Sequence, residues 1–213
     1  MNTRPYHIKA VLFDWDGTLV QTDERTEGQL RSDICCPKHK SLLEFLQSLS
    51  KQPEKERILA VFDAYESVIA PGCKPHPGVK HVLQYIIALG LPVGVISHWT
   101  KTTLRAGLQG IEKIGADDFA IVISQDDIVH RAASTDLIQM AARELGVSAE
   151  NLAVISSHPS MIKSARKNGA VAIHLQARPD AGGPGGNADF EIARIQEIND
   201  IVRMGSPLPA GKL

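Results

Sequence analysis

The stretch VLFDWDGTLVQT, residues 11–22, carries an apolar strand directly into two aspartates, a glycine and a threonine. The apolar run at 8–13 is typical of a buried strand. Asp14 and Asp16 follow it at the carboxyl end, which is the edge where open α/β sheets bind their ligands. The stretch therefore predicts a sheet with a polar site at its edge.

Four more short apolar runs follow along the chain, and helical patterns separate them. Short strands that alternate with amphipathic helices are typical of a parallel sheet covered by helices on both faces. We therefore predict the α/β class, a Rossmann-like three-layer sandwich around a central parallel sheet. Its strands are expected at 8–13, 92–96, 119–123, 152–156 and 171–175.

The segment between the first two predicted strands breaks this alternation, because it contains helical patterns and no convincing strand. The patterns lie at 41–50 and 57–70, after the polar stretch TDERTEGQLRSD, which is also expected to be helical. An insertion at this point lies over the ligand edge of the sheet and would act as a lid. We predict a core domain of residues 1–20 and 76–213 with an all-helical cap insertion at 21–75.

Composition and charge favour a small-molecule ligand. The formal net charge of −1 gives no long-range attraction for nucleic acid or for an anionic membrane. No run of about 18 apolar residues appears, and MNTRPYHIK at the start lacks the apolar core of a secretory signal, so we expect a soluble, cytoplasmic protein. Three cysteines do not form the pattern of a disulfide framework, and the oligomeric state is not readable from the sequence.

Two carboxylates with one residue between them can divide the work of moving a phosphoryl group. The first can attack phosphorus while backbone N–H groups of the following turn, at Gly17 and Thr18, hold the phosphoryl oxygens. The second can protonate the leaving group and later take a proton from water. The alternative is that DWDG is an ordinary turn after a strand, since Asp and Gly are common in turns. The full stretch at 11–22 favours the site.

This stretch resembles the first motif of the haloacid dehalogenase superfamily, whose members are mostly phosphomonoester phosphatases and phosphomutases. PHPGVKHVLQYIIALGLPVGVISHWTK, residues 75–101, is similar to the helix and strand of the second motif. STDLIQMAARELGVSAENLAVIS, residues 134–156, and the later ARKNGAVAIHL and ADFEI are similar to the remaining elements in the family's order. The second aspartate of DWDGT favours the phosphatase branch with a small C1-type helical cap over the dehalogenases.

The resemblance assigns roles to individual residues. Asp14 would be the nucleophile that becomes an aspartyl phosphate, and Asp16 would be the general acid and base. Ser97 would bind phosphate at the end of the second motif, next to His98. Family members use Mg²⁺, which would be held by Asp14, by the backbone carbonyl of Asp16 and by an acidic residue of the fourth motif.

The third and fourth motifs depart from the family pattern. Alignment on Asp136 places Ala132 where the family has a lysine, with Arg131 one residue earlier as a substitute phosphate anchor. Ser157 stands where the fourth motif has its metal-binding aspartate. A hydroxyl offers a dipole in place of a full charge, so weakened Mg²⁺ binding, or a transition metal in its place, is expected.

Two further groups of residues could add to the site. His98, His130 and His158 follow or adjoin these motifs, so they are expected at the same sheet edge as phosphate ligands, metal ligands or acids and bases, or else as ordinary exposed loop histidines. Two C-x2-H pairs near the ends of the insertion have the residue types of a tetrahedral zinc site, although such short pairs also arise by chance. They are Cys36 with His39 and Cys73 with His76.

Two function classes follow from these observations. The first is a hydrolase, namely a phosphatase that cleaves a small phosphorylated metabolite through an aspartyl-phosphate intermediate, with the cap selecting the substrate. The second is a degenerate relative that binds a ligand or a partner without efficient turnover. They differ in whether the changed third and fourth motifs still support chemistry.

Overall fold

The computed structural model describes residues 5–21, 23–38, 40–49, 53–112, 114–130, 136–176 and 188–206. Its centre is a six-stranded parallel sheet with the strand order β3-β2-β1-β4-β5-β6. The strands are β1 (Ala10–Asp14), β2 (Val93–Ile96), β3 (Ile121–Ile123), β4 (Leu152–Ser156), β5 (Val171–Leu175) and β6 (Phe190–Ile192). The predicted α/β class and parallel sheet are confirmed.

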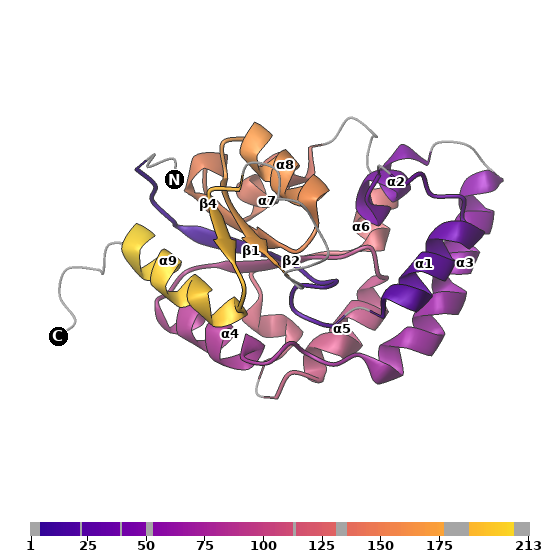
Figure 1. The fold of residues 1–213 in the computed structure, drawn as a ribbon, viewed down its shortest axis with the longest axis horizontal. Helices are drawn as coiled ribbons and strands as arrows, with labels where there is room; N and C mark the ends of the chain where they lie inside the picture. Colours follow the sequence, from indigo (N-terminus) through magenta and orange to yellow (C-terminus); the bar gives the residue numbers. More distant parts are fainter. Residues whose placement is uncertain are drawn as a thin grey trace.

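Helices cover both faces of the sheet (Figure 1). Along β1 the side chains alternate, with Val11 and Phe13 in one hydrophobic cluster and Ala10 and Leu12 in the other. The first cluster includes side chains of α4 (Val79–Ala88), α5 (Lys101–Gln109) and α9 (Ile198–Gly205). The second includes side chains of α6 (Gln125–Val129), α7 (Leu137–Glu144) and α8 (Pro159–Lys167). Because both faces are covered, β1 is apolar at every position before its terminal aspartate.

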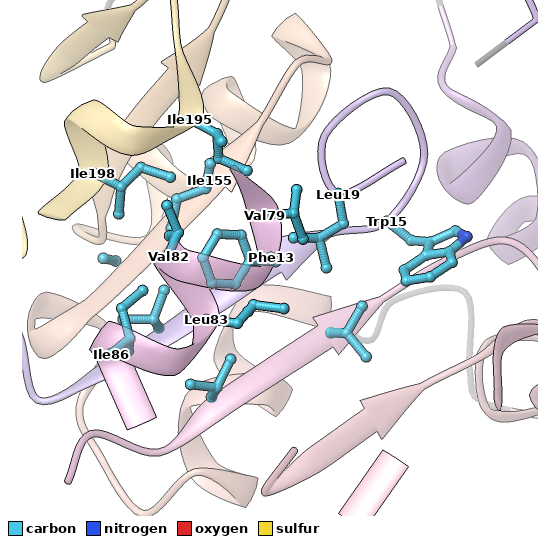
Figure 2. Close-up of a cluster of buried hydrophobic side chains, with 14 of the residues drawn as sticks. Phe13, Trp15, Leu19, Val79, Val82, Leu83, Ile86, Ile155, Ile195 and Ile198 are labelled. Carbon is cyan, nitrogen blue, oxygen red and sulfur yellow. The ribbon is translucent and has the colours of Figure 1, made fainter. Parts of the chain in front are cut away.

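The first cluster fixes the start of the loop that follows β1. Phe13 and Ile155 meet the apolar face of α4 and two isoleucines near the C-terminus (Figure 2). Trp15 is fully buried, and it contacts Trp99 edge-on with ring centroids 6.4 Å apart. Gly107 of α5 leaves room for this indole, since a Cβ there would lie 2.6 Å from the Trp15 ring. Trp15 thus anchors the backbone between the two aspartates.

Three helices lie between β1 and α4, as predicted for this segment. They are α1 (Glu24–Asp33), α2 (Leu42–Ser48) and α3 (Glu54–Ile69), and a short 3-10 turn, η1 (Ala70–Gly72), follows them. Asp23 caps α1, and Ser41 with Glu44 forms a capping box at the start of α2. The apolar sides of these helices join the second hydrophobic cluster. The polar stretch of the sequence analysis is therefore α1, a capped helix, as expected.

The two ends of this segment are paired with each other. Val20 and Pro75 form an antiparallel bridge, in which the Gln21 amide donates to the Lys74 carbonyl at 2.8 Å and the His76 amide donates to the Leu19 carbonyl at 2.9 Å. The chain thus leaves the core and returns to it at adjacent points.

Two polar contacts hold the helices of this segment against the core. Glu66 of α3 is buried and accepts two hydrogen bonds from Thr100, one from its amide at 2.7 Å and one from its hydroxyl at 2.6 Å. Lys55 of α3 donates to the carbonyl of Val129 in α6 at 2.5 Å. These contacts reach two different core helices and fix the orientation of α3.

Some details differ from the sequence expectation. Helices α5, α6 and α9 were not predicted. Helix α9, which follows β6, has only a short apolar stripe. The sequence predicts a helix over 135–145 with Ser134 as its cap, but α7 begins at Leu137, because the Asp136 carboxylate accepts hydrogen bonds from the amides of Ile138 and Gln139. In the described part of the chain, no helix is long and apolar enough to cross a membrane.

Candidate active site

The two aspartates lie at the carboxyl end of β1. The neighbouring strands β2 and β4 lie on opposite sides of β1, so the chain connections run from this point towards opposite edges of the sheet. Asp14 is the last residue of β1 and pairs with Ile96 of β2, while β4 lies on the other side of β1. Gly17 has a φ of +66°, a conformation that favours glycine and turns the chain sharply after Asp16. Both carboxylates are buried, with 3% and 4% exposure. The sheet topology thus concentrates two acids in one small space.

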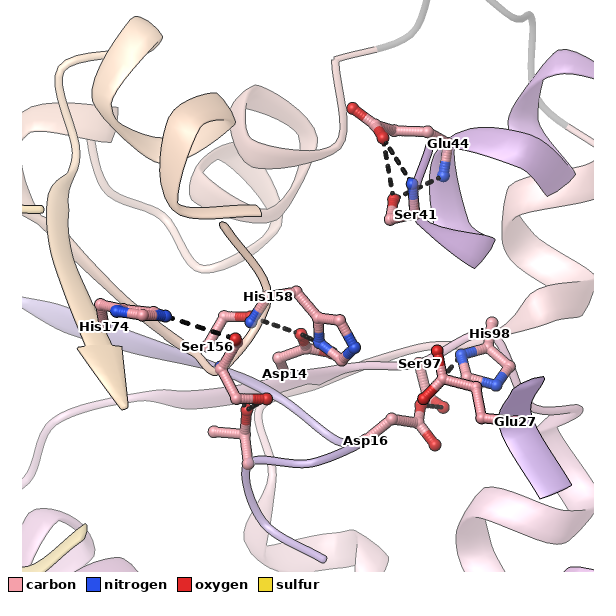
Figure 3. A network of polar contacts seen from close by, with 12 residues as sticks. Asp14, Asp16, Glu27, Ser41, Glu44, Ser97, His98, Ser156, His158 and His174 are labelled. Atoms are coloured by element: carbon pink, nitrogen blue, oxygen red, sulfur yellow. Dashed lines mark hydrogen bonds and ion pairs between the residues drawn. The ribbon is translucent and has the colours of Figure 1, made fainter. Parts of the chain in front are cut away.

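Asp14 is held by the last residue of β4 and by the residue that caps α8 (Figure 3). The Ser156 hydroxyl donates to Asp14 Oδ2 at 2.6 Å, and His158 Nδ1 lies 3.0 Å from the same oxygen. Ser156 Oγ in turn accepts the His158 amide at 2.9 Å. His158 is the N-cap residue of α8, with Pro159 at the first helical position, so its backbone is fixed.

Asp16 has a matching pair of partners at the end of β2 (Figure 3). The Ser97 hydroxyl donates to Asp16 Oδ2 at 3.0 Å, and His98 Nδ1 lies 3.1 Å from that oxygen. The His98 ring also contacts Phe62 of α3 edge-on, with centroids 5.8 Å apart. Each carboxylate therefore has one serine and one histidine.

The carboxylates change the proton affinities of the histidines. Burial lowers the pKa of His158, but the hydrogen bond and the charge of Asp14 outweigh it and raise the pKa to about 9. Burial also opposes the charged form of His98, and Asp16 outweighs it, so its pKa is raised above the ordinary value. At neutral pH His158 is therefore an imidazolium paired with Asp14.

The remaining residues predicted near this edge connect the loop after β1 to β4. Thr18 is fully buried, and its hydroxyl accepts the Ser157 amide at 2.8 Å. The carbonyl of Ser157 lies 3.3 Å from Nε2 of His174, a buried residue of β5. In this arrangement Thr18 and Ser157 position backbone, and it is Ser156 that contacts Asp14.

A small cavity of about 20 Å³ opens beside Asp14. A single water needs about 10–15 Å³ of such space, so the cavity is too small for a phosphate ester in this arrangement. His98 and His158 line it together with residues of the inserted helices, among them Arg31 of α1. A larger cavity of about 200 Å³ adjoins it and shares the lining residues Ser41, Leu43, Ser160 and Met161.

The side chains around Asp14 do not fit Mg²⁺, which prefers several oxygen ligands, chiefly anionic ones. The partners of Asp14 are a hydroxyl that donates to it and a positively charged imidazole. Among the described residues, no group of three or more His, Cys, Asp and Glu side chains could hold a metal ion. Ser157, which stands where the family has its metal-binding aspartate, offers only a hydroxyl, and its amide donates to Thr18.

Several predicted site residues are not brought to this cavity. Arg131, with Ala132, lies outside the described residues. His130 is the exposed C-cap residue of α6 and is not one of the described residues that line the cavity.

The predicted zinc site gains no support. Cys36 and Cys73 pack against different hydrophobic clusters, and His39 lies outside the described residues. Burial, with a smaller contribution from Asp16, raises the pKa of Cys73 to about 12, so this thiol stays protonated and is a poor ligand. His76 hydrogen-bonds the backbone of Gly17 instead.

Sequence reasoning missed four residues of the site. Ser156 was passed over for its neighbour, and a weak signal for it was that the last residue of β4 lies level with Asp14. Ser160 and Arg31 line the cavity, and Glu66 holds α3 beside His98. Nothing in the sequence marks Arg31 or Glu66, because each meets the site only through tertiary packing.

Comparison with known proteins agrees with this geometry. Residues 8–169 match the family model of the haloacid dehalogenase-like hydrolases. The chain therefore belongs to this hydrolase family, as the resemblance of its motifs indicated.

Individual relatives extend the likeness to nearly the whole chain. It is 26% identical to a phosphoglycolate phosphatase of Chromobacterium violaceum, over 93% of this chain and 98% of the relative. It is 25% identical to a glyceraldehyde 3-phosphate phosphatase of Methanopyrus kandleri, over 92% of this chain and 97% of the relative. The solved structure of a hydrolase from Pseudomonas syringae has the same fold, with a TM-score of 0.69 at 15% identity, over 93% of this chain and all of that one (100%).

Proposed function

We propose that this chain is a phosphomonoester hydrolase that acts on a small phosphorylated metabolite through a covalent phosphate on Asp14. The observation that carries the proposal is the pair of buried carboxylates at the end of β1, each fixed by its own serine and histidine. Relatives named as phosphatases over almost their whole length support the same reaction. The alternative of a degenerate binding protein is not favoured, because both carboxylates keep dedicated partners.

The reaction takes place in two steps. In the first, an oxygen of Asp14 attacks phosphorus, the ester P–O bond breaks, and Asp16 as a carboxylic acid gives its proton to the leaving oxygen. In the second, a water attacks the aspartyl phosphate, Asp16 takes the water's proton, and the Asp14–phosphorus bond breaks to release phosphate. Since Ser156 and His158 both contact Oδ2 of Asp14, we assign the attack to Oδ1.

Positive groups around the cavity would stabilise the transferring phosphoryl group. His158 and His98 are both shifted towards their charged forms, and Arg31, which pairs with Glu27 of the same helix at 2.9 Å, lines the same cavity. Such fixed charges act strongly in a buried site, because little water screens them. Ser97 keeps its predicted role beside the phosphate only if its hydroxyl turns from Asp16.

We also propose that α1, α2 and α3 form the cap. The cavity beside Asp14 is too small for a substrate while these helices cover it, so they must move for the substrate to enter. The adjoining cavity, between α2 and the helices α7 and α8, would receive the alcohol part of the ester. Its lining includes Glu44 and Asp136 and favours a hydroxylated, uncharged or cationic group there.

The test is hydrolysis of p-nitrophenyl phosphate and of small sugar and acid phosphates by the full chain. We expect release of phosphate by the wild type and none by the Asp14→Asn variant. When a rapidly cleaved substrate is used and the reaction is stopped with acid, the protein should carry phosphate on Asp14, formed in an initial burst. Asp117→Asn, at an exposed aspartate of the short 3-10 turn before β3, is the matched control.

Equal rates in the wild type and in Asp14→Asn would identify a contaminating phosphatase and refute the proposal. An absence of turnover on every ester, with correctly folded protein, would favour the binding-protein alternative.

A further inference from the structure

The immediate partners of Asp14 bear on whether a metal ion can bind beside this carboxylate. A carboxylate oxygen offers two lone pairs. On Asp14 Oδ2 both are used, by Ser156 Oγ at 2.6 Å and by His158 Nδ1 at 3.0 Å. A divalent cation at this oxygen would have to displace one of these groups.

The two partners are held in place by the fold. Ser156 ends β4, whose preceding residue Ile155 pairs with Phe13 of β1, so this serine lies beside Asp14. The Ser156 hydroxyl links Asp14 to the backbone of His158, and Pro159 fixes the start of α8 directly after it. Displacement of either side chain would therefore disturb the junction between β4 and α8.

The chemistry of these partners opposes a cation. The Ser156 hydroxyl donates its hydrogen to Asp14, and His158 Nδ1 donates its N–H to the same oxygen, so this nitrogen offers no lone pair to a metal ion. The described residues offer no third acidic side chain that would complete a metal group.

We propose that Ser156 and His158 occupy the place of the divalent cation beside Asp14, so that this enzyme transfers the phosphoryl group without a bound metal. This inference rests on the proposed function. It assigns the place of the metal at Asp14 to the hydrogen-bond donors of Ser156 and His158, and the bonds that form and break are those of the two steps above. His158 itself gives up no proton in either step.

The experiment measures metal binding and activity separately. Full-length protein is dialysed against a chelator, and its Tm and its p-nitrophenyl phosphate turnover are measured with and without Mg²⁺ or Mn²⁺. We expect neither quantity to change for the wild type. Ser156→Asp restores a carboxylate beside Asp14 and should gain a metal-dependent rise in Tm of about 5 °C or more at about one hundred times Kd.

Two variants complete the design. Ser148→Asp adds the same charge at an exposed serine before β4 and should show no metal response. His158→Gln should lose about 10²–10³-fold in kcat, and added metal should not restore it.

A metal-dependent rise in the Tm of the wild type, or turnover that disappears on chelation and returns with Mg²⁺, would overturn the inference and leave the proposed function intact. If no protein shows turnover, the proposed function fails, and with it the claim of metal-free transfer. A response of Ser156→Asp to metal would then still show that Ser156 decides whether a cation binds.

Discussion

Asp14 and Asp16 lie two residues apart and are held alike, yet their partners come from different parts of the molecule. Ser156 and His158, which hold Asp14, both belong to the junction of β4 and α8 in the core. His98, which holds Asp16, follows β2 but packs against Phe62 of α3. Both hydrogen-bond partners of the nucleophile therefore come from the core, whereas one partner of the acid and base also contacts the inserted helices.

The largest expected effect separates the roles of the two carboxylates. Asp16→Asn should lower kcat/KM by about 10²–10⁴-fold for an alkyl phosphate, because the leaving alkoxide then lacks its proton donor. The loss should be smaller for p-nitrophenyl phosphate, whose leaving group needs little protonation. Steady-state kinetics on both esters check this, with Asp117→Asn as the control. An equal loss on the two esters would mean that Asp16 does not protonate the leaving group.

The second effect concerns the histidine on the core side. The pKa of His158 is raised to about 9 in the folded state, against about 6.5 when unfolded. Its stabilisation of the fold, of about 3 kcal/mol at most, is therefore fully present below pH 6.5 and is lost as the pH rises through about 9. Urea unfolding of wild type and His158→Gln should show a difference at about pH 6 that has nearly vanished at about pH 9.5.

His81→Gln, at an exposed position on α4, is the matched control for this titration. A difference between wild type and His158→Gln that stays constant over this pH range would mean that His158 is not paired with Asp14 in solution.

The smallest effect concerns the contact that holds the inserted helices near Asp16. Glu66→Gln keeps one acceptor for Thr100 and should cost less than about 1 kcal/mol of unfolding free energy at pH 7. Burial raises the pKa of Glu66, so its favourable contribution is present below its unfolded pKa and is lost as the pH rises through the folded value. The free energy of unfolding of the wild type should therefore rise relative to that of Glu66→Gln as the pH falls from about 7 to about 4.

Unfolding measured at both pH values checks this, with Glu56→Gln at an exposed position of the same helix as the control. A difference between wild type and Glu66→Gln that does not change on acidification would show that Glu66 is solvated, and that α3 is not closed over His98.

The strands and the two aspartates could be predicted because they depend on local pattern. Residues 8–13 are apolar without interruption, and only the carboxyl end of such a strand offers Asp14 and Asp16 to a ligand. The choice between Ser156 and Ser157 depends on the side of β4 that each residue faces, which the pairing with β1 sets. The contact of Glu66 with Thr100 joins residues distant in sequence, and no periodicity reveals it.

The paired backbone at Val20 and Pro75 makes the inserted helices exchangeable. An antiparallel pair brings its two strands within about 5 Å, a gap that a two-residue hairpin turn can close. The core can therefore accept a short turn, or the helices of another protein, at this junction without any change to β1 or α4. This single antiparallel bridge closes the base of the segment, so the inserted helices could be replaced while β1 and the two aspartates are kept.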